Sequence, residues 1–195
     1  MLRIAHRINT RAQLEHLPTD FGAEVDIRSR GEDLIIHHDP FHDGEMFENW
    51  LAAYRHRLLI LNVKEEGLEQ RLLSLMDRHG IQSFFFLDQS FPFLIRTARA
   101  GERRCAVRVS EYEAIDTALS LAGMVDWVWV DCFSSFPLTG EKAKILRDAG
   151  FKLCFVSPEL HGRTGAGVVQ AYRDDIARHG LKGDAVCTKL LDAWA

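Results

Sequence analysis

The stretch Leu58–Leu87, LLILNVKEEGLEQRLLSLMDRHGIQSFFFL, shows one repeat of the pattern that decides the fold. The runs Leu58–Val63 and Phe84–Leu87 are apolar at nearly every position, which is typical of strands covered on both faces. Between them, apolar residues recur with helical spacing, and Gly80 stands where a helix often ends. The helical positions are Leu68, Leu72, Leu75 and Met76. The stretch therefore predicts a strand, a helix and a second, parallel strand.

The same alternation of apolar strand-like runs and helical segments continues in both directions along the chain. Helical segments fit Arg11–Leu17, Glu45–Arg55 and Phe91–Ala100, and three more follow later in the sequence. The first of these follows a capping-box spacing at Ser110 and Glu113. The second has Thr139 as its predicted N-cap and ends at Gly150. The third ends at Gly180, and its apolar positions are Val168, Val169, Tyr172 and Ile176. The predicted strands are Leu2–Ala5, Ala23–Ile27, Leu58–Val63, Phe84–Leu87, Cys105–Val109, Trp127–Val130, Lys152–Val156 and Ala185–Cys187.

Eight strands that alternate with helices favour a closed (β/α)8 TIM barrel over an open sheet. One extra piece interrupts the pattern after the second strand. Ser29–Asp33 is predicted to be a turn, and Leu34–Ile36 a short β extension that doubles back. No linker, repeat or low-complexity tract is seen, so we expect residues 1–195 to form one compact α/β barrel domain.

Composition and charge narrow the class of protein. The net charge of −4 argues against a nucleic-acid partner, and no apolar run approaches the roughly 20 residues of a transmembrane segment. The N-terminus resembles a first strand rather than a secretory signal. The four cysteines have no zinc or redox spacing, and we expect them to be buried and reduced. A cytoplasmic location is the expectation that follows.

The second strand breaks the buried-strand rule with Glu24 and Asp26, which flank Val25 and share one face. Two neighbouring carboxylates inside a protein need a positive partner, and a divalent cation with oxygen ligands is one solution. In the third strand, Asn62 offers a carbonyl oxygen to a metal. Lys64 offers a charge to a phosphate or to the carboxylates. A bridge from Lys64 to the second strand is the alternative, and both interpretations can hold together.

Histidines lie near the predicted position of these carboxylates. His6 directly follows the first strand, and His38 follows the extension after the second. Histidine transfers protons near neutral pH, and Asp39 is suited to fix the tautomer of an imidazole. The rival interpretation is a transition-metal site in the loop that carries His37, His38, Asp39, His42 and Asp43.

Other predicted strands also end in polar residues, as expected at the mouth of a barrel that binds a polar ligand. Arg108 and Lys189 are the candidates for contacts with an anion. Gly162, Gly165 and Gly167 make the loop after the seventh strand either a flexible connection or a phosphate-binding loop.

Taken together, His6-Arg7, Glu24-Val25-Asp26 and His37-His38-Asp39 resemble the glycerophosphodiester phosphodiesterase family. The resemblance is strongest over the first third of the chain, and Leu61–Lys64 extends it. It implies that His6 and His38 are the general acid and base, and that Glu24, Asp26 and Asn62 hold Mg²⁺ or Ca²⁺. It further implies that Lys64 contacts the phosphate or neutralises charge. We expect Arg7 to contact the phosphate as well, together with Arg108 and Lys189 at their strand ends. Related phospholipase C-like barrels share this layout, which points to a role in lipid metabolism.

Three departures separate the chain from the family pattern. The glycine that usually follows His-Arg is Ile8, which places the shape of that loop in question. The usual third acidic ligand, a glutamate in strand three, is Asn62, so weaker metal binding is expected. Only Phe41–Arg57 stands in place of the family's longer insertion, so a more open pocket is expected.

The leading hypothesis is a metal-dependent phosphoric diester hydrolase acting on a small phosphodiester, such as a glycerophosphodiester, by acid–base catalysis with two histidines. The alternative is a non-catalytic barrel that binds a phosphorylated small molecule or a partner protein. A third interpretation is a lyase or aldolase that uses Lys64 as a Schiff base.

Overall fold

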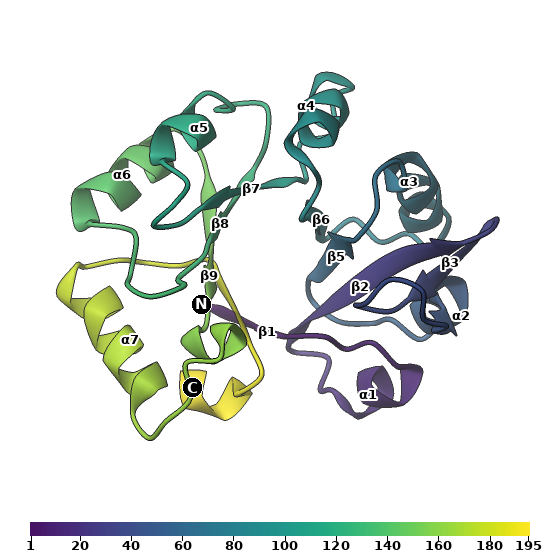
Figure 1. Ribbon diagram of the computed structural model, residues 1–195, viewed down its shortest axis with the longest axis horizontal. Helices are drawn as coiled ribbons and strands as arrows, with labels where there is room; N and C mark the ends of the chain where they lie inside the picture. Colours follow the sequence, from purple (N-terminus) through teal and green to yellow (C-terminus); the bar gives the residue numbers. More distant parts are fainter. The chain divides into compact units, whose positions relative to one another are not determined.

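The computed structural model describes all 195 residues, which divide into two compact units. The N-terminal unit is Ala5–Ala100, and the C-terminal unit combines Gly101–Ala195 with Met1–Ile4. Each unit has a β-sheet, and helices connect most of the successive strands (Figure 1). Alternating β and α elements are therefore confirmed, whereas closure into one eight-stranded barrel and the single-domain organisation stay predictions.

The sheet of the N-terminal unit has the strand order β4-β3-β2-β5-β6. Strand β5 lies parallel to both β2 and β6, whereas β3 pairs antiparallel with β2 and with β4. The elements are β2 (Gly22–Arg30), β3 (Asp33–Ile36), β4 (Glu45–Met46), β5 (Leu59–Val63), β6 (Phe84–Leu87), α1 (Arg11–His16), α2 (Phe47–Leu51), α3 (Glu69–Arg78) and α4 (Phe91–Arg99).

The C-terminal unit contains the remaining strands in the order β1-β10-β9-β8-β7. Strands β7 to β10 run parallel, and α5, α6 and α7 lie on one side of them in Figure 1. The elements are β1 (Leu2–Ala5), β7 (Ala106–Val109), β8 (Trp127–Val130), β9 (Lys152–Val156), β10 (Ala185–Thr188), α5 (Ile115–Leu119), α6 (Gly140–Asp148), α7 (Val168–Arg178), and the 3-10 helices η1 (Pro158–His161) and η2 (Leu191–Trp194).

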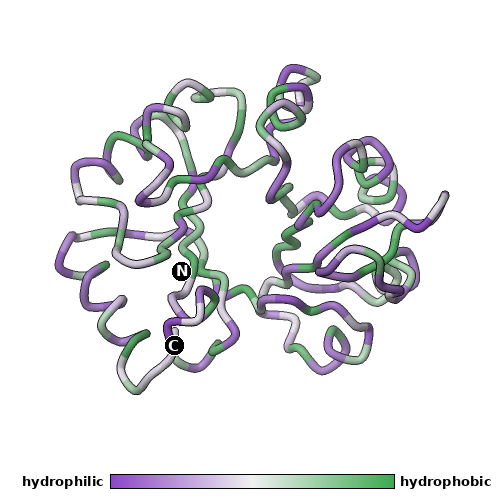
Figure 2. The backbone as a smooth tube through the Cα atoms, in the orientation of Figure 1, coloured by the Kyte–Doolittle hydropathy of each residue, from purple (hydrophilic) through white to green (hydrophobic).

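The predicted strands are apolar because they are buried in the structure. Every residue of β5, β6, β8 and β10 is buried, and hydrophobic colouring follows the strands in Figure 2. The helices bury one face, as α3 does with Leu72, Leu75 and Met76. Gly80 has the positive φ of 66° expected of a residue just after a helix. All four cysteines are free and buried, as predicted.

The β extension after the second strand is confirmed, but its surroundings differ from the prediction. Strand β2 continues to Arg30 because β3 pairs with its last four residues. The predicted helix Glu45–Arg55 is wrong at both ends. Glu45–Met46 forms β4 by pairing with β3, and helix α2 extends only from Phe47 to Leu51. Pairing with β3 therefore overrides local helical periodicity at this point.

Two predicted helix caps have different outcomes. Thr139 caps α6, because its hydroxyl accepts a hydrogen bond from the backbone N–H of Lys142 at 3.3 Å. The capping box at Ser110 and Glu113 is wrong, since α5 begins at Ile115 with Ala114 as its N-cap. The hydroxyl of Ser110 does donate to the Glu113 carboxylate at 2.7 Å, but this contact stabilises the loop before the helix.

Candidate functional site

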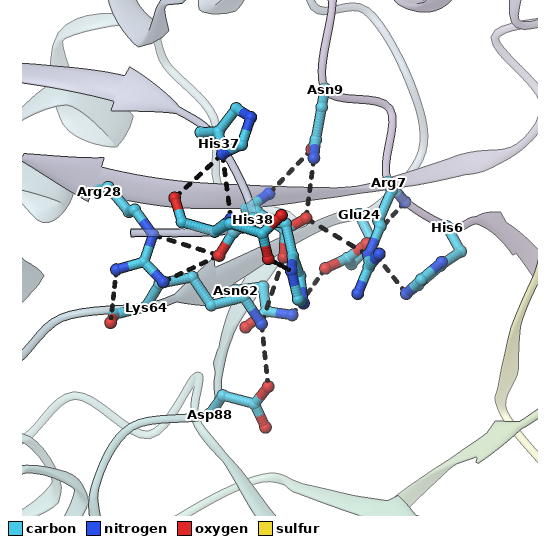
Figure 3. Close-up of polar contacts among 12 residues, drawn as sticks. His6, Arg7, Asn9, Glu24, Arg28, His37, His38, Asn62, Lys64 and Asp88 are labelled. Carbon is cyan, nitrogen blue, oxygen red and sulfur yellow. Dashed lines mark hydrogen bonds and ion pairs between the residues drawn. The ribbon is translucent and has the colours of Figure 1, made fainter. Parts of the chain in front are cut away.

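Strand β2 places two acidic side chains in the interior of the N-terminal unit. Glu24 and Asp26 are both completely buried. Asp26 stands beside Asn62 of β5 in the parallel register, and the Asn62 side-chain N–H donates to Glu24 Oε1 at 2.8 Å. The alternation predicted from the sequence thus brings two carboxylates and one amide into a single buried cluster, shown in Figure 3.

The loop after β1 closes over this pair. The backbone N–H of Arg7 donates to Glu24 Oε2 at 2.7 Å, and the backbone N–H of Ile8 donates to the Glu24 carbonyl at 2.8 Å. Arg7 adopts a left-handed backbone with φ of 55°, whereas Ile8 does not. The left-handed conformation of this loop thus falls at Arg7, and Ile8 does not have to adopt it.

Asn9 is a member of this cluster that sequence reasoning missed. Its side chain donates to Asp26 Oδ2 at 2.8 Å and accepts from the Asp26 backbone N–H at 3.0 Å. The only available signal was a polar residue three positions after His6. Arg7 also reaches the cluster, with its Nε 3.6 Å from Asp26 Oδ2.

Positive charge reaches the carboxylates from Lys64, which directly follows β5. Its Nζ lies 3.2 Å from Asp26 Oδ1 and 3.3 Å from Asp88 Oδ2 (Figure 3). The predicted alternative of a bridge from Lys64 to the second strand is therefore present. The predicted contact between Lys64 and a phosphate stays a prediction.

Burial changes the protonation behaviour of Glu24. Burial raises the pKa of Glu24, and the charge of Asp26 raises it further. Hydrogen bonds from Arg7 and Asn62 and the charge of Lys64 act in the opposite direction but do not cancel the effect, so the pKa of Glu24 reaches about 7. Glu24 is therefore poised to lose a proton near neutral pH when positive charge arrives.

The oxygen atoms of this cluster suit a hard divalent cation. Asn62 Oδ1 is buried and accepts no hydrogen bond from the protein, and Asp26 Oδ1 is held only by the Lys64 ion pair. Carboxylate and amide oxygens are the donors that Mg²⁺ and Ca²⁺ prefer. No group of three or more His, Cys, Asp and Glu side chains could hold a metal. A cation would therefore depend on Asn62 as its third protein ligand.

The predicted histidines lie at two edges of the N-terminal unit's polar cluster. His6 places Nε2 3.8 Å from Glu24 Oε2. His38 follows β3, and its Nδ1 is 2.8 Å from Asp39 Oδ1. This hydrogen bond is the largest influence on Asp39 and lowers the pKa of its carboxyl group. The pairing of His38 with Asp39 has the form in which a carboxylate orients an imidazole.

The rival metal site in the loop after β3 is not formed. The rings of His37 and His42 stack with centroids 4.7 Å apart, and His37 Nδ1 lies 3.0 Å from the Asp39 carbonyl. No combination of acidic, histidine or cysteine side chains converges there to hold a metal.

The two remaining predicted phosphate contacts belong to the C-terminal unit. Arg108 is paired with Asp131, with 3.1 Å between Nη1 and Oδ2, and Asp131 also contacts His161. The backbone N–H of Lys189 donates to Glu159 Oε1 at 3.0 Å. Neither contact tests an interaction with a phosphate, so both assignments stay predictions.

Fold and site together define an α/β protein of β/α repeats with buried acidic and amide side chains on neighbouring parallel strands. No protein-family model matches the chain, and no curated protein sequence matches it. None of its helices is both long and apolar enough to cross a membrane.

Solved structures supply a closer comparison. A glycerophosphodiester phosphodiesterase from Agrobacterium tumefaciens str. C58 superposes with a TM-score of 0.66 at 13% identity, covering 100% of this chain and 99% of that one. A glycerophosphoryl diester phosphodiesterase from Parabacteroides distasonis ATCC 8503 gives 0.70 at 14% identity, covering 98% and 84%. The chain therefore has the fold of these phosphodiesterases, as the sequence resemblance predicted.

Proposed function

We propose that this protein is a metal-dependent phosphodiesterase that hydrolyses a small, glycerophosphodiester-like phosphodiester. The observation that carries the proposal is the buried cluster of Glu24, Asp26 and Asn62 beside His6. The cluster combines a carboxylate whose pKa is raised to about 7 with an amide oxygen that accepts no protein hydrogen bond. Such features are concentrated at functional sites. The similarity in fold to two phosphodiesterases supports the same class of reaction.

In this proposal, Glu24, Asp26 and Asn62 would hold Mg²⁺ or Ca²⁺. The cation would polarise the phosphoryl oxygens and neutralise the charge that develops on them. Lys64 forms an ion pair with Asp26 and brings the positive charge of its ammonium to the edge of the cluster. Arg7 brings its guanidinium to the same edge and is the second candidate for contact with the phosphate.

The two histidines would move the protons. Because His38 Nδ1 donates to Asp39, a neutral His38 keeps a lone pair on Nε2, which is the form required of a general base. His38 would take a proton from the attacking water or substrate hydroxyl as the new P–O bond forms. His6 would then give its proton to the leaving alcohol oxygen as the other P–O bond breaks.

The direct test is hydrolysis by the purified protein. Glycerophosphodiesters, lysophospholipids and a chromogenic diester would be assayed with Mg²⁺, Ca²⁺ or Mn²⁺ and with a chelator. We expect metal-dependent turnover that is lost in Glu24→Gln, while Glu15→Gln, an exposed glutamate of α1, serves as the matched control. Turnover that survives both the chelator and Glu24→Gln would exclude the metal-dependent reaction.

A second candidate function is favoured by the bridge from Lys64 to Asp26. With the amide of Asn62 already bonded to Glu24, the protein's own groups neutralise part of the acidic cluster. A non-catalytic protein that binds a phosphorylated small molecule would need no more. Calorimetric binding of a phosphodiester without hydrolysis of any member of the panel would favour this candidate.

A further inference from the structure

Arg28 connects the two segments of the N-terminal unit that carry His38 and Lys64. Its Nε and Nη2 donate to the His38 carbonyl at 3.2 and 2.8 Å, and its Nη1 donates to the Lys64 carbonyl at 3.4 Å. Figure 3 shows the guanidinium between these two segments. Both contacts are with main-chain atoms, so Arg28 fixes the path of the backbone rather than the side chains themselves.

The charge of Arg28 is already balanced within the protein. Glu65 Oε1 lies 3.4 Å from Nη1, and Glu65 is itself held by the Ser29 backbone N–H at 3.1 Å and the Ser29 hydroxyl at 2.5 Å. The side chain of Arg28 is only 13% exposed. A guanidinium has five N–H groups in a fixed plane, and these contacts engage all three of its nitrogens. Arg28 is thus arranged to act through its neighbours rather than on a phosphate.

Much of the segment that carries His38 is exposed. The His38 and Asp39 side chains are 38% and 62% exposed, and Phe41 is fully exposed with a left-handed φ of 64°. A segment with few buried contacts opens easily by local unfolding. A bidentate hydrogen bond to the His38 carbonyl therefore restricts the segment at the residue whose position matters most to the reaction.

We propose that Arg28 is a positioning residue that holds the main chain at His38 and Lys64 in the arrangement needed for turnover. This inference rests on the proposed function and adds a residue to that site. Because Arg28 lies two positions after Asp26 on β2, one strand would hold both a cation ligand and the support for the general base. Loss of the support should lower kcat more than it raises KM, since a displacement of about 1 Å can cost about 100-fold in rate.

The test compares Arg28→Gln and Arg28→Lys with Arg30→Gln. Arg30 lies on the same strand and also contacts the segment after β3, but through an exposed ion pair with Asp43 at 3.2 Å. Such pairs contribute little, so kcat of Arg30→Gln should stay within about twofold. Arg28→Gln should lower kcat about 10- to 100-fold with KM changed less than about threefold. Arg28→Lys keeps the charge but not the planar fork, so it should restore only a small part of kcat.

Hydrogen–deuterium exchange supplies a readout that does not depend on activity. Faster exchange in Arg28→Gln, confined to residues 37–42 and 64–66 with an unchanged Tm, would support positioning. Faster exchange across the whole chain would instead show a general loss of stability and overturn the inference. Normal kcat with raised KM would also overturn it, because Arg28 would then contact the substrate.

The failure of the proposed function can be separated from the failure of this inference. If the wild-type protein hydrolyses no diester, the phosphodiesterase proposal fails. Local exchange in Arg28→Gln would still show whether Arg28 holds the two segments. Unchanged exchange there would overturn the inference whatever the activity.

Discussion

The two units treat two of their acidic residues, Glu111 and Glu24, in opposite ways. In the C-terminal unit, Glu111 follows β7 and accepts backbone N–H groups of Phe133, Ser134 and Ser135 at 3.1, 2.6 and 2.6 Å. Burial alone would raise the pKa of Glu111, but these donors outweigh it and lower the pKa to about 2. In the N-terminal unit, Glu24 has a pKa raised to about 7. Backbone N–H groups of the loop after β8 stabilise the charged form of Glu111, whereas burial favours the protonated form of Glu24.

The two units also differ in which residues have a strained, positive-φ backbone. The non-glycine residues with positive φ are Arg7, Phe41 and Asp88, and all belong to the N-terminal unit. They lie after β1, after β3 and after β6, where the candidate site residues also occur. In the C-terminal unit, every residue with positive φ is a glycine. Strained backbone persists where the surrounding structure demands it, which is common at functional sites. The comparison is therefore consistent with the proposed reaction in the N-terminal unit, while the acid of the C-terminal unit stabilises a loop.

The largest effect is expected from the two histidines of the N-terminal unit. His6→Ala and His38→Ala should each lower kcat by about 10²- to 10⁴-fold, because proton transfer in the transition state is lost. Steady-state kinetics checks the rate, and thermal unfolding checks that the fold is intact. His179→Ala, which removes an exposed histidine of the C-terminal unit, is the control and should behave as wild type. Full activity in both site variants would contradict the assignment of His6 and His38 as general acid and base.

A second prediction concerns the proton on Glu24. Because the pKa of Glu24 is about 7, binding of Mg²⁺ or Ca²⁺ at pH 6 should release a proton, and affinity should rise about tenfold per pH unit below pH 7. Calorimetry in buffers of different ionisation enthalpy measures the release. Glu24→Gln should show neither release nor pH dependence. Proton release that persists in Glu24→Gln would assign the raised pKa to another group.

The same group should affect stability when no metal is added. The pKa of Glu24 is about 7 in the folded protein against 4.5 for an ordinary glutamate, so the folded state binds more protons between these values. The free energy of unfolding should therefore fall as pH rises from about 4.5 to about 7. Glu24→Gln should flatten this slope in urea titrations across that range.

Much of the fold was predictable because burial on both faces leaves a direct mark on composition. The runs at β5, β6 and β8 contain almost no polar residue, and their bounds agree with the prediction within one residue. Helix α2 was harder, because Glu45–Met46 is drawn into β4 by β3, a partner that local periodicity does not reveal. Short segments at sheet edges follow their tertiary neighbours rather than their own propensity.

The candidate site was predictable to the extent that side-chain alternation controls it. Glu24, Asp26 and Asn62 meet because parallel strands align residues of the same face. Arg28 continues that alternation, but its partners are main-chain carbonyls whose positions depend on the path of two loops. Asn9 was missed for the same reason. Contacts with a loop backbone leave no periodic signal in the sequence.

A smaller effect, on the free energy of unfolding, is expected from Glu111, whose carboxylate accepts three backbone hydrogen bonds. Glu111→Gln should lower the free energy of unfolding by about 1–2 kcal/mol, because three charge-assisted hydrogen bonds become weaker in a partly exposed loop. Since the pKa of Glu111 is depressed to about 2, its contribution is complete above pH about 4.5 and is lost as pH falls toward 2.

Urea unfolding at pH 7 and at pH 3 measures this contribution. The difference between wild type and Glu111→Gln should shrink at the lower pH. Glu32→Gln, at an exposed glutamate of the turn between β2 and β3, is the control. An equal difference at both values would show that the charge of Glu111 does not stabilise the loop.

The smallest expected effect tests whether strain in the N-terminal unit is retained for function. Phe41 is fully exposed at φ of 64°, a conformation that asparagine tolerates better than phenylalanine. Phe41→Asn should therefore raise the free energy of unfolding by about 0.5–1 kcal/mol. Phe91→Asn, at an exposed phenylalanine with a helical backbone, should bring no gain. Increased stability with reduced turnover would show that the strained loop serves the reaction, because a residue selected for folding alone would not lose activity when its strain is relieved.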